Sequence, residues 1–309
     1  MNPLKLAELR YQKRTTIWRT TLFLALVMLL YFGFGMLILL FFASTGNPDW
    51  HQIAKDGSRV RLFQMVQMLS QVLVLAMPVV IMRLRHGDQR YPMTRVLPSW
   101  SVIRIPLPWP QMLTGAFGIL LLQPLVQAAT LLQNLYLWPA LGEAGAEVLR
   151  LQGESEQFMR TMFSVRTIPD VMMAFLVLVM TPSICEELLF RGYVQQNYEI
   201  SMGRGGAVAL TGLLFAFFHG SAANLLSLAL LGGYIGYIYS KTRNLAVPVA
   251  AHFANNFFAL MALFSEQSDV VLPLSETLWS GWFVVVASLV CLLPVLGYFS
   301  RMAFSGDAG

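Results

Sequence analysis

The sequence predicts an all-α protein, a polytopic membrane bundle of about eight transmembrane helices. Of its 309 residues, 56% are hydrophobic and only 12% are charged, and the mean hydropathy is +0.60. A soluble fold would not need to bury so much apolar surface. The apolar runs are continuous over about 20 residues, the length of a membrane-spanning helix. They do not alternate in units of about ten residues, as the strands of a membrane barrel do.

Eight apolar runs define the expected spans. They cover residues 18–43, 62–82, 111–138, 170–189, 207–219, 223–240, 245–264 and 277–300. The fifth is short, so it would cross the membrane only if residues 203–206 also enter it or if it lies beside other protein. We expect one integral membrane domain over 1–309. The acidic connection 139–169 predicts an amphipathic helix on the membrane surface, and the prolines of 91–110 predict an interfacial loop.

The basic residues predict the orientation of these spans. Fifteen of the 21 Lys and Arg residues lie on the side of the amino terminus, and six lie on the other side. Because cytoplasmic loops carry the excess, we expect both termini in the cytoplasm of a multi-pass protein in the plasma (inner) membrane of a bacterium. The net charge of +5 is spread over short loops, which argues against a nucleic-acid partner. Cys185 and Cys291 lie in apolar segments, so we expect no disulfide.

Charged side chains end the fourth apolar run, at Glu186, Glu187 and Arg191. Ionisable groups inside a membrane are costly, and they are usually paired or functional. Glu187 and Arg191 are four residues apart and share a helical face, in the favourable order. Adjacent helical residues point about 100° apart, so Glu186 must address another partner. We predict an ion pair between Glu187 and Arg191, and a free Glu186 carboxylate at the cytoplasmic end of the span.

Two histidines lie within or at the end of later apolar runs. His219 follows Phe215 by one turn, and Phe215 is expected to hold the rotamer of the imidazole. His252 shares a helical face with Asn256, whereas Asn255 is expected to bridge helices. A lone membrane histidine is more often a hydrogen-bond partner between helices. Two histidines together with a paired glutamate favour a catalytic site.

These groups suggest a hydrolytic reaction. A carboxylate and an imidazole, Glu186 and His219, could take a proton from one water. A second imidazole and an amide, His252 and Asn256, could stabilise the oxyanion that forms when this water attacks a carbonyl. The residues therefore predict hydrolysis of an amide or ester within the membrane.

The three motifs together resemble those of a known family. Glu-Glu-x-x-x-Arg at 186–191, Phe-x-x-x-His at 215–219 and His-x-x-x-Asn at 252–256 occur in this order. They are similar to the motifs of the CPBP family, which comprises the CAAX endoproteases of the Ras-converting type and their bacterial relatives, also called the Abi group. The resemblance covers about residues 170–264, and the family has a similar eight-span plan. The first three spans carry no matching motif.

This resemblance implies an intramembrane protease. By it, Glu186 and His219 activate the water, His252 and Asn256 form the oxyanion site, and the ion pair of the first motif supports Glu186. The implied substrate is a peptide or protein in the lipid bilayer, with or without a lipid anchor. The family name implies prenylated carboxyl-terminal tails, but no prenyl-binding groove is evident in the sequence. Gly232, Gly233 and Gly236 instead predict a small-residue face for helix packing.

Three alternatives remain open. Glu186, His219 and His252 offer the ligand types of a two-His-one-carboxylate zinc site, but the chain has no His-Glu-x-x-His motif, so we favour a reaction without a metal cofactor. Glu and His chains also serve transporters and proton relays, although we find none of the inverted repeats of transporters. A non-catalytic protein of the same fold, with a binding or immunity role, is the third alternative. The presence of every catalytic-type residue argues against it.

Overall fold

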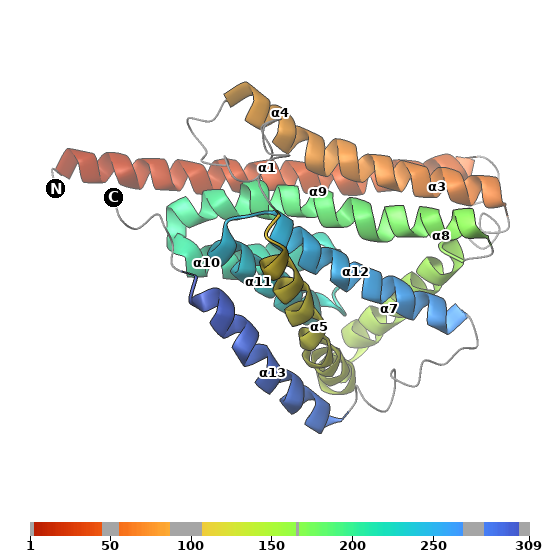
Figure 1. Ribbon diagram of the computed structural model, residues 1–309. Coiled ribbons are helices and arrows are strands. Elements are labelled where there is room, and N and C mark those ends of the chain that lie inside the picture. Colours follow the sequence, from red (N-terminus) through yellow and green to blue (C-terminus); the bar gives the residue numbers. More distant parts are fainter. Residues whose placement is uncertain (1–2, 45–55, 87–106, 165–166, 268–280, 303–309) are drawn as a thin grey trace.

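The computed structural model describes residues 3–44, 56–86, 107–164, 167–267 and 281–302 (Figure 1). These residues are helical almost throughout and include no strand, which confirms the all-α prediction. Six of their helical segments are long and apolar enough to cross a membrane: Thr16–Ile38, Gly57–Met82, Trp109–Ala140, Ile168–Phe218, Ala246–Ser265 and Trp282–Ser300. The protein is therefore a multi-pass membrane protein. Most of the interfacial loop expected at 91–110 lies outside the described residues.

Every expected span overlaps a helical segment, and residues 277–280 of the last span lie outside the described residues. In chain order the elements are α1 (Pro3–Ser44), α3 (Gly57–Ser70), π-helical η1 (Gln71–Ala76), α4 (Met77–His86), α5 (Trp109–Leu132), π-helical η3 (Gln133–Leu137), α6 (Trp138–Ala140), α7 (Glu143–Met162), α8 (Ile168–Phe175), π-helical η4 (Leu176–Met180), α9 (Thr181–Leu189), π-helical η5 (Phe190–Val194), α10 (Gln195–Phe218), α11 (Leu225–Thr242), α12 (Ala246–Gln267) and α13 (Trp282–Ser300). The fourth and fifth expected spans fall within a single segment of the six, Ile168–Phe218, and α11 is not among the six. The count of eight is thus approximate.

The fourth span does not end where the sequence predicted. Helix α9 continues through η5 into α10, and the helical backbone changes direction only at Gly203, with φ +80° and ψ 171°. Glu186 consequently lies in the interior of a long helix and not at its end, and residues 192–202 are not a loop. Gly203 is suited to the break because glycine has no Cβ to clash in this backbone region. The fifth span begins beyond this kink and includes residues 204–206.

Polar side chains misled the prediction of that helix end. Arg191 and Gln195 are fully buried, and both donate hydrogen bonds to backbone carbonyls of α11, at Gly232 (2.8 Å) and Gly236 (3.0 Å). Gln196 donates to the hydroxyl of Tyr239 on the same helix at 2.6 Å. Arg191 therefore belongs to the interior of the bundle, although the predicted topology places it among the 15 Lys and Arg residues on the cytoplasmic side.

Glycines allow α10 and α11 to approach closely. A Cβ on Gly212 would lie 2.8 Å from the backbone nitrogen of Gly233, and one on Gly232 would lie 3.0 Å from Cδ1 of Phe215. A Cβ on Gly236 would lie 3.0 Å from Oε1 of Gln195. The predicted small-residue face is therefore confirmed for Gly232 and Gly236. A Cβ on Gly233 would meet nothing within 4 Å.

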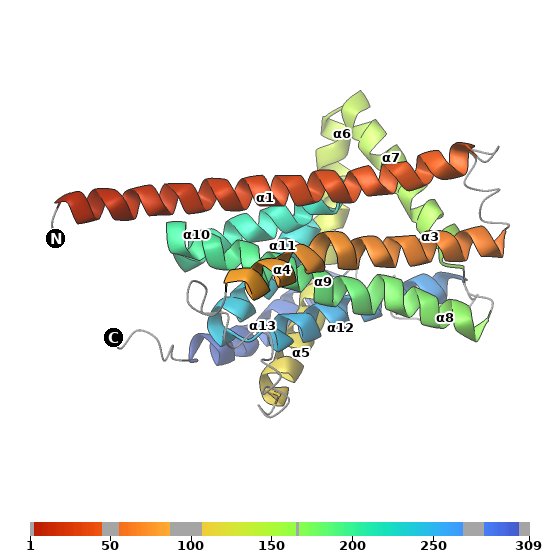
Figure 2. The same cartoon turned by 90° about the horizontal axis from the view of Figure 1, so that it is seen from above.

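The remaining helices surround this pair. Helices α1, α3 and α8–α9 run side by side in both views, and α5, α12 and α13 pack together on another side of the bundle (Figures 1 and 2). The amphipathic helix predicted within 139–169 is present as α7, which extends outward from the bundle in Figure 2. The beginning of α1 and the end of α13 lie at the same end of the molecule in both figures.

Candidate active site

A buried charge cluster lies where α9, η5, α11 and α12 meet. Nη1 of Arg191 donates to Oε1 of Glu187 at 2.9 Å, and both side chains are 0% exposed. The ion pair predicted from the spacing is therefore present. The guanidinium also lies over the ring of Phe215, with 4.9 Å from Cζ to the ring centroid. Together with the bond to the carbonyl of Gly232, these contacts compensate a cation that would be costly to bury alone, while its Nε has no hydrogen-bond partner among the described residues.

Glu187 has a second partner that the sequence did not reveal. Nδ1 of His252 lies 2.8 Å from Oε1 of Glu187, and His252 is buried. Because a carboxylate only accepts hydrogen bonds, Nδ1 carries the hydrogen. The spacing of residues along one helix could identify Arg191 as a partner, but it could not identify a residue 65 positions away. Glu187 thus fixes the orientation of His252 and directs Nε2 away from the ion pair.

Glu186 faces the other histidine. Its Oε2 lies 3.8 Å from Nε2 of His219, which is too long for a direct hydrogen bond. This oxygen is buried and has no hydrogen-bond partner among the described residues. Nδ1 of His219 lies 2.8 Å from the carbonyl oxygen of Phe215, and since a carbonyl only accepts, Nδ1 is the donor. When the ring is neutral, Nε2 of His219 is therefore a hydrogen-bond acceptor. Two acceptors, this Nε2 and Oε2 of Glu186, then face each other at 3.8 Å.

Phe215 contacts both histidines. Its ring centroid lies 4.6 Å from that of His219 and 5.7 Å from that of His252. The contact with His219 agrees with the expected role of Phe215 in holding that imidazole. The additional contacts with His252 and Arg191 place Phe215 between the two halves of the site, the Glu187–His252 pair and the Glu186–His219 pair.

The two asparagines of α12 differ in their contacts. Oδ1 of Asn255 accepts from Gln123 of α5 at 2.9 Å, so Asn255 bridges helices as predicted. Nδ2 of Asn255 donates to Oδ1 of Asn256 at 3.1 Å. That bond leaves the amide NH₂ group of Asn256 without a hydrogen-bond partner among the residues described, on the helical face that it shares with His252.

Helices that carry no motif also reach the site. The hydroxyl of Tyr31 on α1 accepts from Gln67 on α3 at 2.8 Å, and its ring stacks on Phe218 at 5.2 Å between centroids. Gln71 is buried in η1, which packs against α9. Sequence reasoning missed these residues, but polar side chains inside apolar runs were a signal that could have found them.

The candidate metal ligands do not converge. Within the described parts of the chain, no group of three or more His, Cys, Asp or Glu side chains is arranged to hold a metal ion. In this arrangement His252 is directed by Glu187, while Glu186 and His219 face each other. The side chains therefore do not fit the two-His-one-carboxylate zinc site considered from the sequence. Cys185 and Cys291 are both free, as expected.

Fold and site together define a class of protein: a polytopic helical membrane protein with a buried carboxylate–imidazole site. Residues 168–258 match the model of the family described as "Type II CAAX prenyl endopeptidase Rce1-like". This segment contains all three motifs, and its similarity to that family agrees with the resemblance that the motifs indicated. The match covers less than a third of the chain, so the first three spans lie outside it.

One curated relative is also similar. It is a protein of Escherichia coli described as an uncharacterized 24.3 kDa protein, and it is 33% identical over 115 residues. The matched part is 35% of this chain and 52% of the relative, so the chain spans about half the length of the curated protein that it matches. No solved structure matches the chain.

Proposed function

We propose that this protein is an intramembrane endopeptidase that hydrolyses a peptide bond with a water activated by Glu186 and His219. The observation that carries the proposal is the facing pair of acceptors, Oε2 of Glu186 and Nε2 of His219, 3.8 Å apart. A water between them can donate one hydrogen to each. Two fixed acceptors of this kind orient the water and increase its nucleophilicity. The family match over this segment supports the same reaction.

In the first step the water oxygen forms a bond to the carbonyl carbon of the substrate. Glu186 accepts the proton of the water, and the π electrons of the carbonyl move to its oxygen, which becomes an oxyanion. When the tetrahedral intermediate collapses, the carbon–nitrogen bond breaks and the leaving nitrogen takes the proton from Glu186. His219, held through Nδ1 by the carbonyl of Phe215, keeps the water in place and shares its proton.

The second half of the site is suited to the oxyanion. Nδ1 of His252 donates to Glu187, so Nε2 is the ring atom left for the oxyanion, to which it donates when the ring carries both hydrogens. The NH₂ group of Asn256 supplies the second donor. Glu187 then has two functions: it neutralises Arg191 and it positions His252. The proposal uses only side chains of the protein.

We expect the substrate to be a peptide or protein segment at the cytoplasmic leaflet of the inner membrane. Both termini of the enzyme are expected to lie in the cytoplasm. The charge asymmetry of the sequence supports this orientation. The family description names prenylated proteins as substrates of the family. Prenylation is therefore one of the variables to test for this chain.

The test compares peptides of the membrane and secreted fractions from cells that make the wild-type protein or Glu186→Gln. The wild type should yield cleavage products that the variant does not, and the purified variant should lose about 10²–10⁴-fold in rate on such a substrate. His219→Asn should lose a similar amount. Glu156→Gln, a change on the exposed surface of α7, is the matched control and should cleave normally.

Equal peptide sets from wild type and Glu186→Gln would indicate a non-catalytic protein of this fold and end the proposal. Synthetic versions of the substrate with and without a prenyl group would show whether the lipid is required. A rate abolished by chelation and restored by Zn²⁺ would show that a metal takes part.

A further inference from the structure

We propose that the groove between α10 and α11 is a binding site for an anionic phospholipid. The groove has a volume of about 520 Å³, within the range of small-molecule sites. Its lining includes neither Gly232, whose carbonyl binds Arg191, nor any residue of the candidate active site, so the groove is separate from that site. The proposal does not depend on the proposed peptidase activity.

Small residues and tyrosines shape this groove. Gly205 and Ala209 on α10, and Ala229 and Gly233 on α11, are four residues apart on their helices and leave a furrow between them. Gly233 was expected to serve helix packing, but a Cβ there would point into open space, so its missing side chain contributes to the hollow. No groove at this place was predicted from the sequence.

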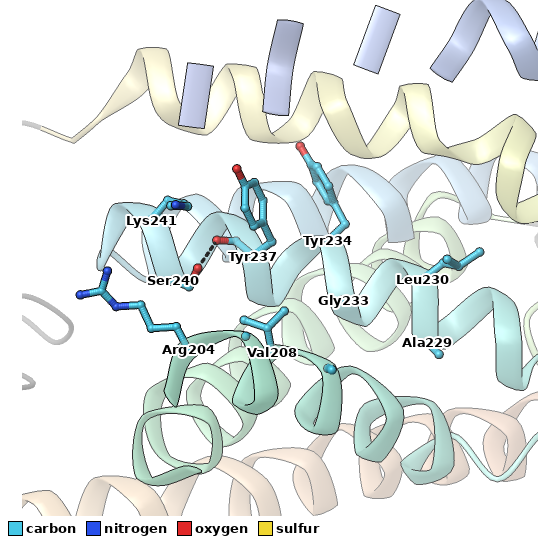
Figure 3. Close-up of a pocket in the computed structure, with 11 residues that line it drawn as sticks. Arg204, Val208, Ala229, Leu230, Gly233, Tyr234, Tyr237, Ser240 and Lys241 are labelled. Atoms are coloured by element: carbon cyan, nitrogen blue, oxygen red, sulfur yellow. Dashed lines mark hydrogen bonds between the residues drawn. The ribbon is translucent and has the colours of Figure 1, made fainter. Parts of the chain in front are cut away.

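The tyrosines of the groove are fixed by neighbouring helices. The hydroxyl of Tyr234 donates to the carbonyl of Gly115 on α5 at 3.0 Å. The hydroxyl of Tyr237 donates to the carbonyl of Leu296 on α13 at 3.2 Å. Figure 3 shows both rings directed toward these helices. These bonds hold in place the two tyrosines that line the groove.

One end of the groove is basic. Arg204 and Lys241 come from different helices and lie at the same end of the groove, while Ala229 and Leu230 lie at the other end (Figure 3). None of the lining residues carries a negative charge. Lys241 lies 5.7 Å from the centroid of the Tyr237 ring and has no carboxylate partner in the described part of the chain. By contrast, the neighbouring Arg243 is paired with Glu199.

This layout matches a phospholipid in shape and charge. Lys241 is eight residues from Gly233 along α11, about 12 Å at the rise of an α-helix. A phospholipid whose acyl chain lies on Gly233 can therefore have its phosphate at Lys241. An apolar furrow accepts the acyl chain, and two cations accept the phosphate and any further negative charge of the headgroup. The basic end is on the side expected to be cytoplasmic, where anionic lipids attract basic residues.

The test measures lipid retained by the purified full-length protein in detergent, by native mass spectrometry, with phosphatidylglycerol or phosphatidylcholine added. The wild type should retain phosphatidylglycerol preferentially. Arg204→Ala with Lys241→Ala should weaken this binding about 30-fold, from the loss of two charge contacts. Arg19→Ala with Arg61→Ala, an equal loss of charge at exposed positions outside the groove, should leave it unchanged.

A second variant tests the furrow without altering charge. Gly233→Leu should fill the groove and reduce phosphatidylglycerol binding to the phosphatidylcholine level, and because the position is open, the fold should be retained. Gly33→Leu, at another open position, is its control. Unchanged binding in either groove variant would overturn the proposal. Equal retention of both lipids would do the same, as would displacement of the phospholipid by an equal concentration of prenylated peptide.

Discussion

Two arginine–glutamate pairs in this protein have nearly the same spacing and opposite surroundings. On α9 and η5, Arg191 follows Glu187 by four residues, and both side chains are 0% exposed. On α7, Arg150 follows Glu147 by three residues. Its Nη2 lies 2.6 Å from Oε1 of Glu147, and both side chains are 53% exposed. Exposed pairs contribute little because water and salt screen them. Removing one partner of a buried pair leaves an uncompensated charge in the interior.

The pairs also differ in what else they bind. Arg150 contacts a second carboxylate of its own helix, that of Glu154, so the exposed cluster stabilises α7 alone. The buried pair connects the continuous helix of α9 and η5 to two others, because Arg191 reaches the carbonyl of Gly232 on α11 and Glu187 reaches His252 on α12. A glutamate–arginine pair on one helix can therefore hold together a buried site or lie on an exposed surface. The spacing of the two residues does not show which of these environments the pair has.

The largest expected effect is that of Glu187→Ala. It should lower the free energy of unfolding by about 3–5 kcal/mol, because Arg191 stays buried without its counter-ion. The measurement is denaturant unfolding of the purified protein in detergent, followed by circular dichroism. Glu147→Ala on α7 is the matched control and should change stability only slightly. Equal losses in the two variants would contradict the distinction between the pairs.

A smaller loss of stability is expected when both buried charges are removed. Glu187→Leu with Arg191→Met replaces the pair by apolar groups of similar size, and such replacements are often neutral or stabilising. We expect thermal unfolding to return toward the wild-type temperature while peptide cleavage stays lost, because Nδ1 of His252 then has no carboxylate to accept its hydrogen. Recovery of cleavage together with stability would show that the bond between Glu187 and His252 has no part in the reaction.

Much of the fold could be predicted from the sequence because a membrane imposes a simple rule. Each apolar run of sufficient length became a helix, and the amphipathic α7 was found between two of them. The predicted end of the fourth span was wrong because Arg191, Gln195 and Gln196 are polar residues of the kind that is common in loops. Their partners are carbonyls and a hydroxyl on α11. Sequence distance hides such partners, so the helix that carries these residues was predicted to end too early.

The candidate site divides in the same way. Contacts within one helix could be predicted, as with Glu187 and Arg191 or Phe215 and His219, since four residues return to the same face. The contact of Glu187 with His252 joins separate helices and needed the fold. Tyr31 and Gln71 were missed because they lie in apolar runs outside the motifs.

The smallest expected effect concerns the exposed pair and its dependence on pH. Hydrogen bonding from Arg150 holds the pKa of Glu147 below its usual value of about 4.5. A depressed pKa means that the folded state favours the carboxylate. The contribution to stability is therefore fully present above the usual pKa and is lost as the pH falls through the lower value of the folded state.

Wild type and Glu147→Gln should consequently differ slightly in unfolding temperature at neutral pH, and the difference should disappear at a pH below the folded-state pKa of Glu147. High salt should also reduce this difference in unfolding temperature, because ions in solution screen the exposed charges of Glu147 and Arg150. The loss caused by Glu187→Ala should withstand the same salt, since no ion reaches a pair that is 0% exposed. A salt response of similar size at both pairs would mean that water enters the interior around Arg191. The carboxylate of Glu187 beside His252 would then be neither shielded from water nor preorganised.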